Sequence, residues 1–206
     1  PAFAAPARIS GQTATERFQR SVEADIAIAE AEQQAKSNPK VARQLLAYAR
    51  DLVTEDSEVW YTSARFEMGQ GNKQAALSYL MQTLKRDATH APAAYDRALL
   101  LMNMNKDDEA KSALESYRKN HADDTRPAYY LGLYAFKAGD NANARKFFDE
   151  ARKGDSQVAA YARAYHALLA NQARDPDGPR FAAETLRRPA AEGAATSHTS
   201  PSHRCL

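Results

Sequence analysis

The chain has 206 residues, of which 44% are hydrophobic and 26% are charged, and these proportions are ordinary for a globular protein. Its 28 basic and 26 acidic residues leave a formal net charge of +2 and are interspersed, which argues against nucleic-acid binding. No run of about 18 apolar residues occurs, so we predict no membrane span, and the single Cys205 permits no internal disulfide.

The first residues predict a flexible leader. Residues 1–12 are rich in alanine, proline, serine and glycine. The chain starts with proline instead of methionine, and Ala2-Phe3-Ala4 has the small-x-small form of a signal-peptidase site. From this we expect a periplasmic or cell-envelope location. An ordinary Ala/Pro-rich leader has the same composition, so a cytoplasmic location is the alternative.

A long first helix is predicted from Thr13 to about Ala35. Thr13 and Glu16 have the spacing of a capping box, in which each side chain binds the other residue's backbone N–H. Apolar residues follow at helical spacing and form one face of this helix, namely Phe18, Val22, Ile26 and Ala29. Ser37-Asn38-Pro39 predicts a turn, with proline at the start of the next helix.

A period of 34 residues organises the middle of the chain. Alanine recurs at this step, and so do a bulky apolar residue four positions later and a turn residue five positions earlier. The three columns are Ala42, Ala76, Ala110, Ala144; Leu46, Leu80, Leu114, Phe148; and Ser37, Gly71, Asn105, Gly139. This period predicts stacked helix–turn–helix units in the windows 23–56, 57–90, 91–124 and 125–158, with no insertion between them.

The pattern resembles the tetratricopeptide repeat (TPR) family over about residues 23–158. The second window carries the family's pattern at Trp60, Ala64, Gly71, Ala76, Leu80 and Thr83, and the fourth carries it at Leu131, Gly132, Gly139, Ala144, Phe148 and Ala151. The third window is looser, with Tyr117 where a small residue is usual. In the first window Glu30 takes a position that is normally small.

The resemblance implies an all-α, right-handed TPR solenoid of about four repeats over residues 13–172. Apolar residues at helical spacing predict a C-terminal capping helix at 157–172. Residues 173–206 lose this periodicity and are rich in proline, alanine, serine and threonine, so we predict a disordered tail.

The family's first helices line a concave groove, which usually receives an extended or helical peptide. The matching positions here predict these partner-binding residues: Tyr61, Arg65, Met68, Tyr95, Leu99, Met102, Tyr129, Tyr130, Leu133 and Phe136, with Ala27 in the tyrosine column of the first repeat. Tyrosine offers a large contact area and a hydroxyl group for a ligand. The same tyrosines are also explained by packing between repeats or by self-association.

The lysines, asparagines and arginine with which some family members grip a partner's C-terminal carboxylate are missing from the matching positions. Those positions hold Ala27, Ala31, Thr62, Pro92 and Asp96. We therefore do not expect chaperone binding of the Hsp90 or Hsp70 type. Arg65 and Arg126 are the groove cations left for an acidic ligand.

No motif for catalysis or cofactor binding occurs. There is no Gly-x-Ser-x-Gly sequence and no glycine-rich phosphate loop. His90, His121 and His166 are predicted as surface residues, and His198, His203 and Cys205 cluster only in the tail. We predict no catalytic residue, no metal and no cofactor, and therefore a protein that is not an enzyme.

The function predicted from these observations is a non-catalytic scaffold that binds a peptide or protein segment in the concave groove. By analogy of fold, the scaffold would serve a bacterial secretion, pilus or exopolysaccharide assembly. One alternative is a self-assembling scaffold, a homo-oligomer in which the apolar face of residues 18–29 enters the groove of another copy. A second alternative is the recruiting domain of a larger enzyme.

Overall fold

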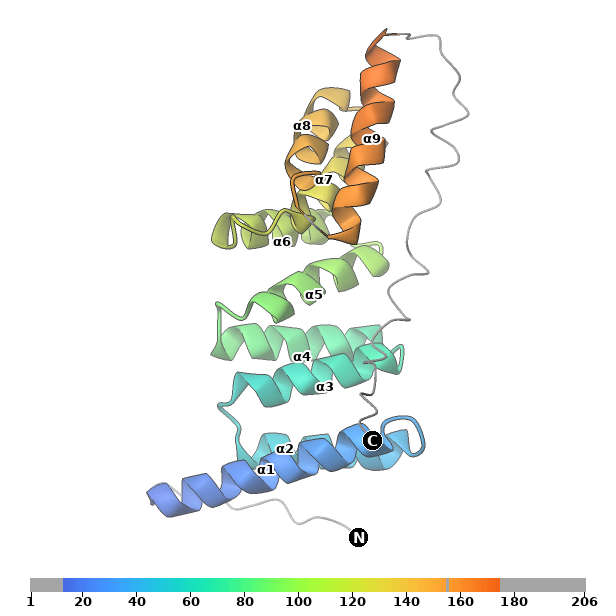
Figure 1. Cartoon of the computed structure of the whole chain (residues 1–206). Coiled ribbons are helices and arrows are strands. Elements are labelled where there is room, and N and C mark those ends of the chain that lie inside the picture. Colours follow the sequence, from blue (N-terminus) through green and yellow to red (C-terminus); the bar gives the residue numbers. More distant parts are fainter. Residues whose placement is uncertain (1–12, 155, 175–206) are drawn as a thin grey trace, which may run out of the picture. The chain divides into compact units, whose positions relative to one another are not determined.

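The computed structural model describes residues 13–154 and 156–174, which form nine α-helices and no strand (Figure 1). The predicted leader and most of the predicted tail, with His198, His203 and Cys205, lie outside this part of the chain. The helices belong to two compact units, one ending at His121 and the other starting at Ala122. Each unit is described by itself.

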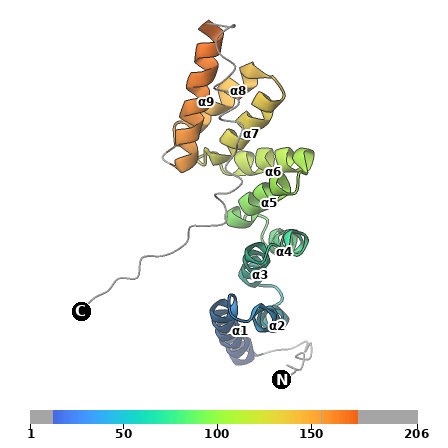
Figure 2. The same cartoon turned by 90° about the vertical axis from the view of Figure 1, so that its right-hand side faces the viewer.

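Unit 1 consists of three helical hairpins (Figure 2). They are α1 Ala14–Gln34 with α2 Pro39–Leu52, α3 Ser57–Gly69 with α4 Lys73–Arg86, and α5 Ala91–Asn103 with α6 Asp107–Asn120. The starts of α4 and α6 lie one 34-residue period apart, as do the starts of α3 and α5. The all-α fold predicted from the periodicity is therefore confirmed.

Helix boundaries follow the local chemistry of the sequence. The capping box is present, because Thr13 Oγ1 accepts the Glu16 N–H and Glu16 Oε2 accepts the Thr13 N–H. Gly71 and Asn105 adopt left-handed φ angles of 75° and 57° in the turns after α3 and α5. Glycine and asparagine tolerate this conformation, which lets the next N–H reach a carbonyl five residues back and end the helix.

The first hairpin departs from the predicted register. Four residues separate Gln34 from Pro39, whereas three separate the paired helices of the other hairpins. Ser37 does not adopt the left-handed conformation of its counterparts. The prediction that no insertion occurs is therefore wrong: the extra residue moves α1 by one position relative to α2. Glu30, predicted at the small-residue position, is exposed, and the alanines buried in α1 are Ala24, Ala27 and Ala31.

The core of unit 1 is built where the helices of each hairpin cross. Ala42, Ala76 and Ala110 are completely buried, and small side chains at these points let the helices approach closely. Leu80 and Leu114, one helical turn later, are also completely buried. These columns of the 34-residue period are packing positions.

The predicted apolar face of α1 lies on the surface instead of in the core. Phe18, Val22 and Ile26 are 69%, 41% and 56% exposed, and the first buried residue of α1 is Ala24. Ile26 lies between Ala24 and Ala27, which are buried, so the face of α1 that packs inward is the one with the alanines. Phe18 is near the start of α1, which has 21 residues against 14 in α2. The N-terminal end of α1 extends past its partner helix (Figure 1).

A buried carboxylate joins the first hairpin to the second. Glu67 of α3 accepts hydrogen bonds from Arg43 of α2, at 2.6 Å from Nε and 3.0 Å from Nη2. It also accepts one from Asn72 Nδ2 at 2.6 Å. The hydrogen bond from Arg43 is the main reason why the pKa of Glu67 lies below its ordinary value.

Two arginines pack on the one tryptophan of the chain and add a second connection between these hairpins. The guanidinium carbon of Arg86 lies 4.1 Å from the Trp60 ring, and that of Arg50 lies 5.5 Å from it. Both Trp60 Nε1 and Arg86 Nε donate to the carbonyl of Thr54, at 2.9 Å and 2.6 Å. The loop between α2 and α3 is thereby fixed to α4.

Unit 2 is one hairpin, α7 Arg126–Lys137 with α8 Asn141–Ala151, covered by α9 Gln157–Arg174. Gly132 lets α7 approach α8, because a Cβ atom there would lie 2.7 Å from Phe148 Cε1. Tyr165 of α9 stacks on the Phe148 ring at 4.9 Å. A helix is thus present where the cap was predicted, and it continues to Arg174, two residues into the predicted tail.

Candidate functional site

Tyr61 of α3 has its hydroxyl group occupied by the neighbouring repeat. The Tyr61 hydroxyl donates to Asp96 Oδ2 of α5 at 2.9 Å, and its ring lies 4.6 Å from the His90 ring. Burial is the main cause that raises the pKa of Tyr61 well above its ordinary value, and Asp96 adds to the effect. Tyr61 therefore stays neutral and acts as a connection between α3 and α5.

Tyr95 of α5 is buried, and its ring lies 5.4 Å from that of Tyr117 in α6. The other two predicted groove residues of α5, Leu99 and Met102, are half-buried, as is Met68 of α3. Among these predicted groove residues of unit 1, Tyr95 is therefore part of the core, whereas Leu99, Met102 and Met68 remain partly exposed to solvent.

In unit 2 the counterpart, Tyr129, is covered by the last helix. It is 6% exposed, and the Tyr161 and Tyr165 rings of α9 lie 6.3 Å and 6.2 Å from it. Tyr130, Leu133 and Phe136 of α7 are half-buried, and the Phe136 ring packs at 5.5 Å against that of Tyr165. Burial raises the pKa of Tyr129 far above its ordinary value.

A cleft of about 210 Å³ lies between α1 and α3 in unit 1. Its floor is apolar, with Leu46 of α2 and Phe66 of α3, and the small side chains of Ala31 in α1 and Ala35 at its C-cap leave it unfilled. An alignment in strict 34-residue register did not predict this cleft, although Glu30 at a small-residue position signalled the irregularity.

Charged side chains of opposite sign stand on the two sides of this cleft. Arg65 on α3 and Glu32 on α1 both line it, and both are exposed. Neither side chain forms a hydrogen bond or an ion pair with another side chain in the described part of the chain. Thr62 adds a hydroxyl group to the lining. The cleft can therefore enclose an apolar side chain and still offer a cation and an anion to its neighbours.

Arg126, the other predicted groove cation, is committed within its own unit. Its guanidinium binds the Asp124 carboxylate through two parallel contacts, Nε to Oδ1 at 2.9 Å and Nη2 to Oδ2 at 2.6 Å. Arg126 N–H donates to the same carboxylate at 2.9 Å. Two parallel hydrogen bonds of this kind form a strong ion pair, so the guanidinium of Arg126 is already engaged within the protein.

His90 corrects the prediction of surface histidines. It is 6% exposed and lies at the N-cap of α5, where Nδ1 accepts the Ala93 N–H at 3.1 Å. The predicted surface residue His166 is half-buried and lies 3.8 Å from Asp149 Oδ1. Histidine was placed outside because it is polar, but a capping role lets its ring be buried.

Over the residues that the structure describes, no group of three or more histidine, cysteine, aspartate or glutamate side chains could hold a metal ion. In the same part of the chain, no helix is both long enough and apolar enough to cross a membrane.

Hairpins of paired helices that repeat every 34 residues define a helical repeat protein. Residues 68–133, about a third of the chain, match the family model described as tetratricopeptide repeat. No curated protein matches the chain in sequence. TPR proteins are typically scaffolds for protein–protein interaction, without catalytic activity of their own.

Solved structures confirm the fold. MamA (residues 41 to the end) from Desulfovibrio magneticus RS-1 is 20% identical, with a TM-score of 0.61 over 80% of this chain and 92% of that one. PilF of Pseudomonas aeruginosa is 17% identical, with a TM-score of 0.59 over 80% of this chain and 81% of that one. YrrB, described as a TPR protein with an unusual peptide-binding site, is 14% identical, with a TM-score of 0.58 over 87% and 100%.

Proposed function

We propose that unit 1 binds a peptide segment of a partner protein in the cleft between α1 and α3. The segment would place an apolar side chain on the floor formed by Leu46 and Phe66, and an acidic group beside Arg65. The observation that carries this proposal is the cleft itself, an apolar hollow with an uncommitted cation on its rim. The peptide-binding site in the description of YrrB supports the same class of ligand.

The opposite charges on the two sides of the cleft favour one orientation of the bound peptide segment. A segment with an acidic residue toward α3 and a basic residue toward α1 complements both Arg65 and Glu32, whereas a segment of uniform charge meets one of them with like charge. Tyr61, Tyr95 and Tyr129 contribute by holding the helices in place, since their rings or hydroxyl groups are engaged by other helices.

The cleft alone would bind weakly. Burying one leucine-sized side chain contributes roughly 2 kcal/mol, and a solvent-exposed ion pair at Arg65 contributes up to about 1 kcal/mol. Together these give about 3 kcal/mol, which corresponds to a dissociation constant of about 6 mM. A firm complex therefore needs further contacts on the half-buried apolar residues of unit 1, such as Met68, Leu99 and Met102.

Site-specific photo-crosslinking tests the proposal. A photoreactive phenylalanine analogue at Lys36, next to the cleft, should join covalently to one segment of a partner in cell extract. The same analogue at Lys85, an exposed residue of α4 outside the cleft, is the matched control. Ala35→Leu, which fills the cleft, and Arg65→Glu, which reverses its exposed cation, should each abolish the crosslink at position 36. Equal crosslinks at both positions, or a crosslink that survives both substitutions, would refute the proposal.

A self-assembling scaffold is the second candidate, and the exposed apolar face of α1 favours it. Phe18, Val22 and Ile26 lie on that face and are among the most exposed large apolar side chains of the described part of the chain. Light scattering across protein concentration tests it: a mass that rises with concentration, and that returns to the monomer value in Phe18→Ser with Ile26→Ser, supports self-assembly. A constant monomer mass excludes it.

An envelope location is the finer part of the proposal. It is supported by the small-x-small sequence Ala2-Phe3-Ala4 in the first residues. In an envelope location, the scaffold would serve a secretion, pilus or exopolysaccharide assembly. Fractionation of cells that express the full-length gene tests this, and recovery only in the cytoplasmic fraction would contradict it.

A further inference from the structure

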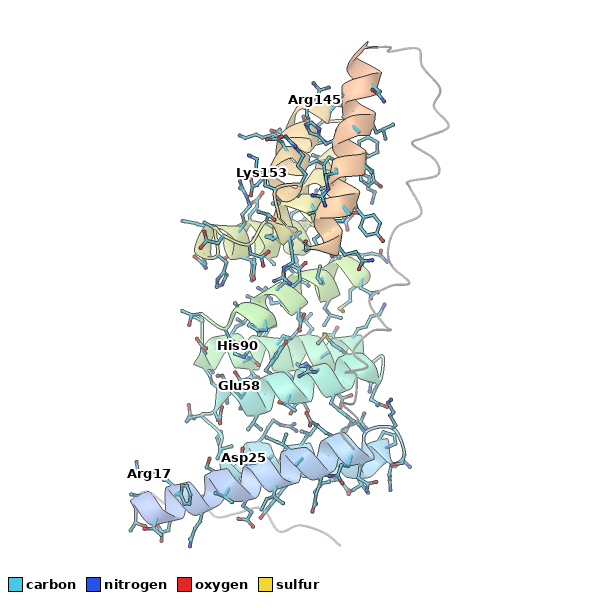
Figure 3. The ribbon with its side chains drawn as sticks, viewed as in Figure 1. Arg17, Asp25, Glu58, His90, Arg145 and Lys153 are labelled. Carbon is cyan, nitrogen blue, oxygen red and sulfur yellow. The ribbon has the colours of Figure 1, made fainter. Side chains whose placement is uncertain are left out.

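His90 makes two hydrogen bonds that together define its protonation state. The Ala93 backbone N–H can only donate, so His90 Nδ1, 3.1 Å away, must accept and cannot carry a proton. The ring proton therefore lies on Nε2, which donates to Glu58 Oε1 of α3 at 3.1 Å. Figure 3 labels Glu58 and His90 at one edge of unit 1. The native contacts require a neutral ring.

The same ring connects α3 to α5. It packs at 4.6 Å against the ring of Tyr61 in α3, whose hydroxyl group binds Asp96 in α5. His90 is also the N-cap of α5, so one buried side chain satisfies the start of one helix and contacts the preceding repeat. Loss of either contact would change the spacing of α3 and α5 on the side where Tyr61 lies.

We propose that His90 is a proton-sensitive latch that holds α5 against α3 while its ring is neutral and releases it in mild acid. A second proton on Nδ1 would convert the acceptor of the Ala93 N–H into a donor, and the cap would be lost. It would also put a positive charge at the N-terminus of α5, where the helix dipole is unfavourable to cations. Histidine is the side chain whose charge ordinarily changes between pH 5 and 8.

The charged groups around the His90 ring determine whether its protonated form is stable in place. Glu58 of α3 and Asp87, the C-cap of α4, carry carboxylates that attract an imidazolium. The Glu58 side chain is 71% exposed, so solvent screens this attraction, and it does not offset the loss of the Ala93 N–H acceptor. Tyr61 and Asp96 are occupied by each other, and Arg65, which lies beside Tyr61, carries a like charge. Acid therefore opens the latch.

Amide hydrogen exchange measured by NMR between pH 8 and pH 5 tests the latch. After correction for the intrinsic pH dependence of exchange, the Ala93 amide should exchange roughly tenfold faster at pH 5, the factor that corresponds to the loss of one helix cap. The change should follow the titration of the His90 ring, read from its carbon-bound proton shifts. The measurement needs no ligand, so its outcome is independent of the proposed peptide binding.

Two variants make the test specific. His90→Asn keeps a capping acceptor that does not titrate, so its Ala93 amide should be protected equally at both pH values. His121→Asn, at the C-cap of α6, is the matched control and should keep the pH response of the unmodified protein. An Ala93 amide that stays protected while His90 titrates would overturn the latch. A His90→Asn variant as sensitive to acid as the unmodified protein would do the same.

Discussion

Replacing Glu67 by alanine tests how the first two repeats are held together. The Glu67 side chain is 3% exposed and accepts three hydrogen bonds, two from Arg43 and one from Asn72. In Glu67→Ala the two donors lose their acceptor. The guanidinium of Arg43, which lies 5.5 Å from the centre of the Phe66 ring, would then have no carboxylate to neutralise it.

The magnitude follows from the exposure of each partner. A hydrogen bond to a charged group is worth about 1.5–3 kcal/mol when it is buried. Arg43 is 43% exposed and can turn to water, so its two bonds together count for about 1 kcal/mol. The Asn72 bond and the lost packing of the side chain add about 1–2 kcal/mol. The free energy of unfolding of unit 1 should therefore fall by about 2–3 kcal/mol.

Urea unfolding followed by tryptophan fluorescence is the assay, because the one tryptophan, Trp60, lies in α3 of unit 1. Glu67→Gln keeps the shape and should lose less than the alanine variant. The double variant Arg43→Met with Glu67→Leu replaces the ion pair by apolar side chains and should lie within about 1 kcal/mol of the unmodified protein. A loss below about 0.5 kcal/mol in Glu67→Ala would show that the ion pair does not hold these hairpins together.

Two further predictions concern acid and close packing. The pKa of Glu67 is lowered in the folded state, so its contribution is complete above the unfolded-state pKa of about 4.3 and is lost as the pH falls through the folded-state value. The advantage of the unmodified protein over Glu67→Gln in urea unfolding should thus shrink between pH 7 and pH 3, and an advantage that stays constant would contradict this. Gly132→Ala should destabilise unit 2 by about 1–2 kcal/mol in thermal unfolding followed by circular dichroism, because the new Cβ meets Phe148. Gly69→Ala, with nothing within 4 Å, is its control, and equal effects of the two would contradict the packing argument.

The sequence alone determined the repeats of this protein. The periodicity indicates which side chains face the partner helix. Gly71, Asn105 and Gly139 mark the turns in which one residue adopts a left-handed conformation. These are local properties, each specified within a few residues, so the fold class and most helices could be predicted.

The tertiary structure decided which of the predicted groove residues keep an exposed surface. Tyr129 is buried because α9 packs on it, and Tyr61 is engaged because Asp96 of the next repeat accepts its hydroxyl proton. The partner-binding set therefore stays a prediction, with Arg65 as its exposed cation in unit 1. Periodicity does not indicate how firmly one repeat packs on the next, and so it did not show the division of the helices into two units.

The cleft between α1 and α3 shows this difference most clearly. The turn between α1 and α2 is one residue longer than its counterparts, Ala31 is buried instead of Glu30, and a hollow remains beside Arg65. The sequence determined the packing of each hairpin, because that packing depends on residues three and four positions apart. Only the tertiary structure decided where α1 lies relative to α3, because that position depends on a turn whose length no repeating pattern specifies.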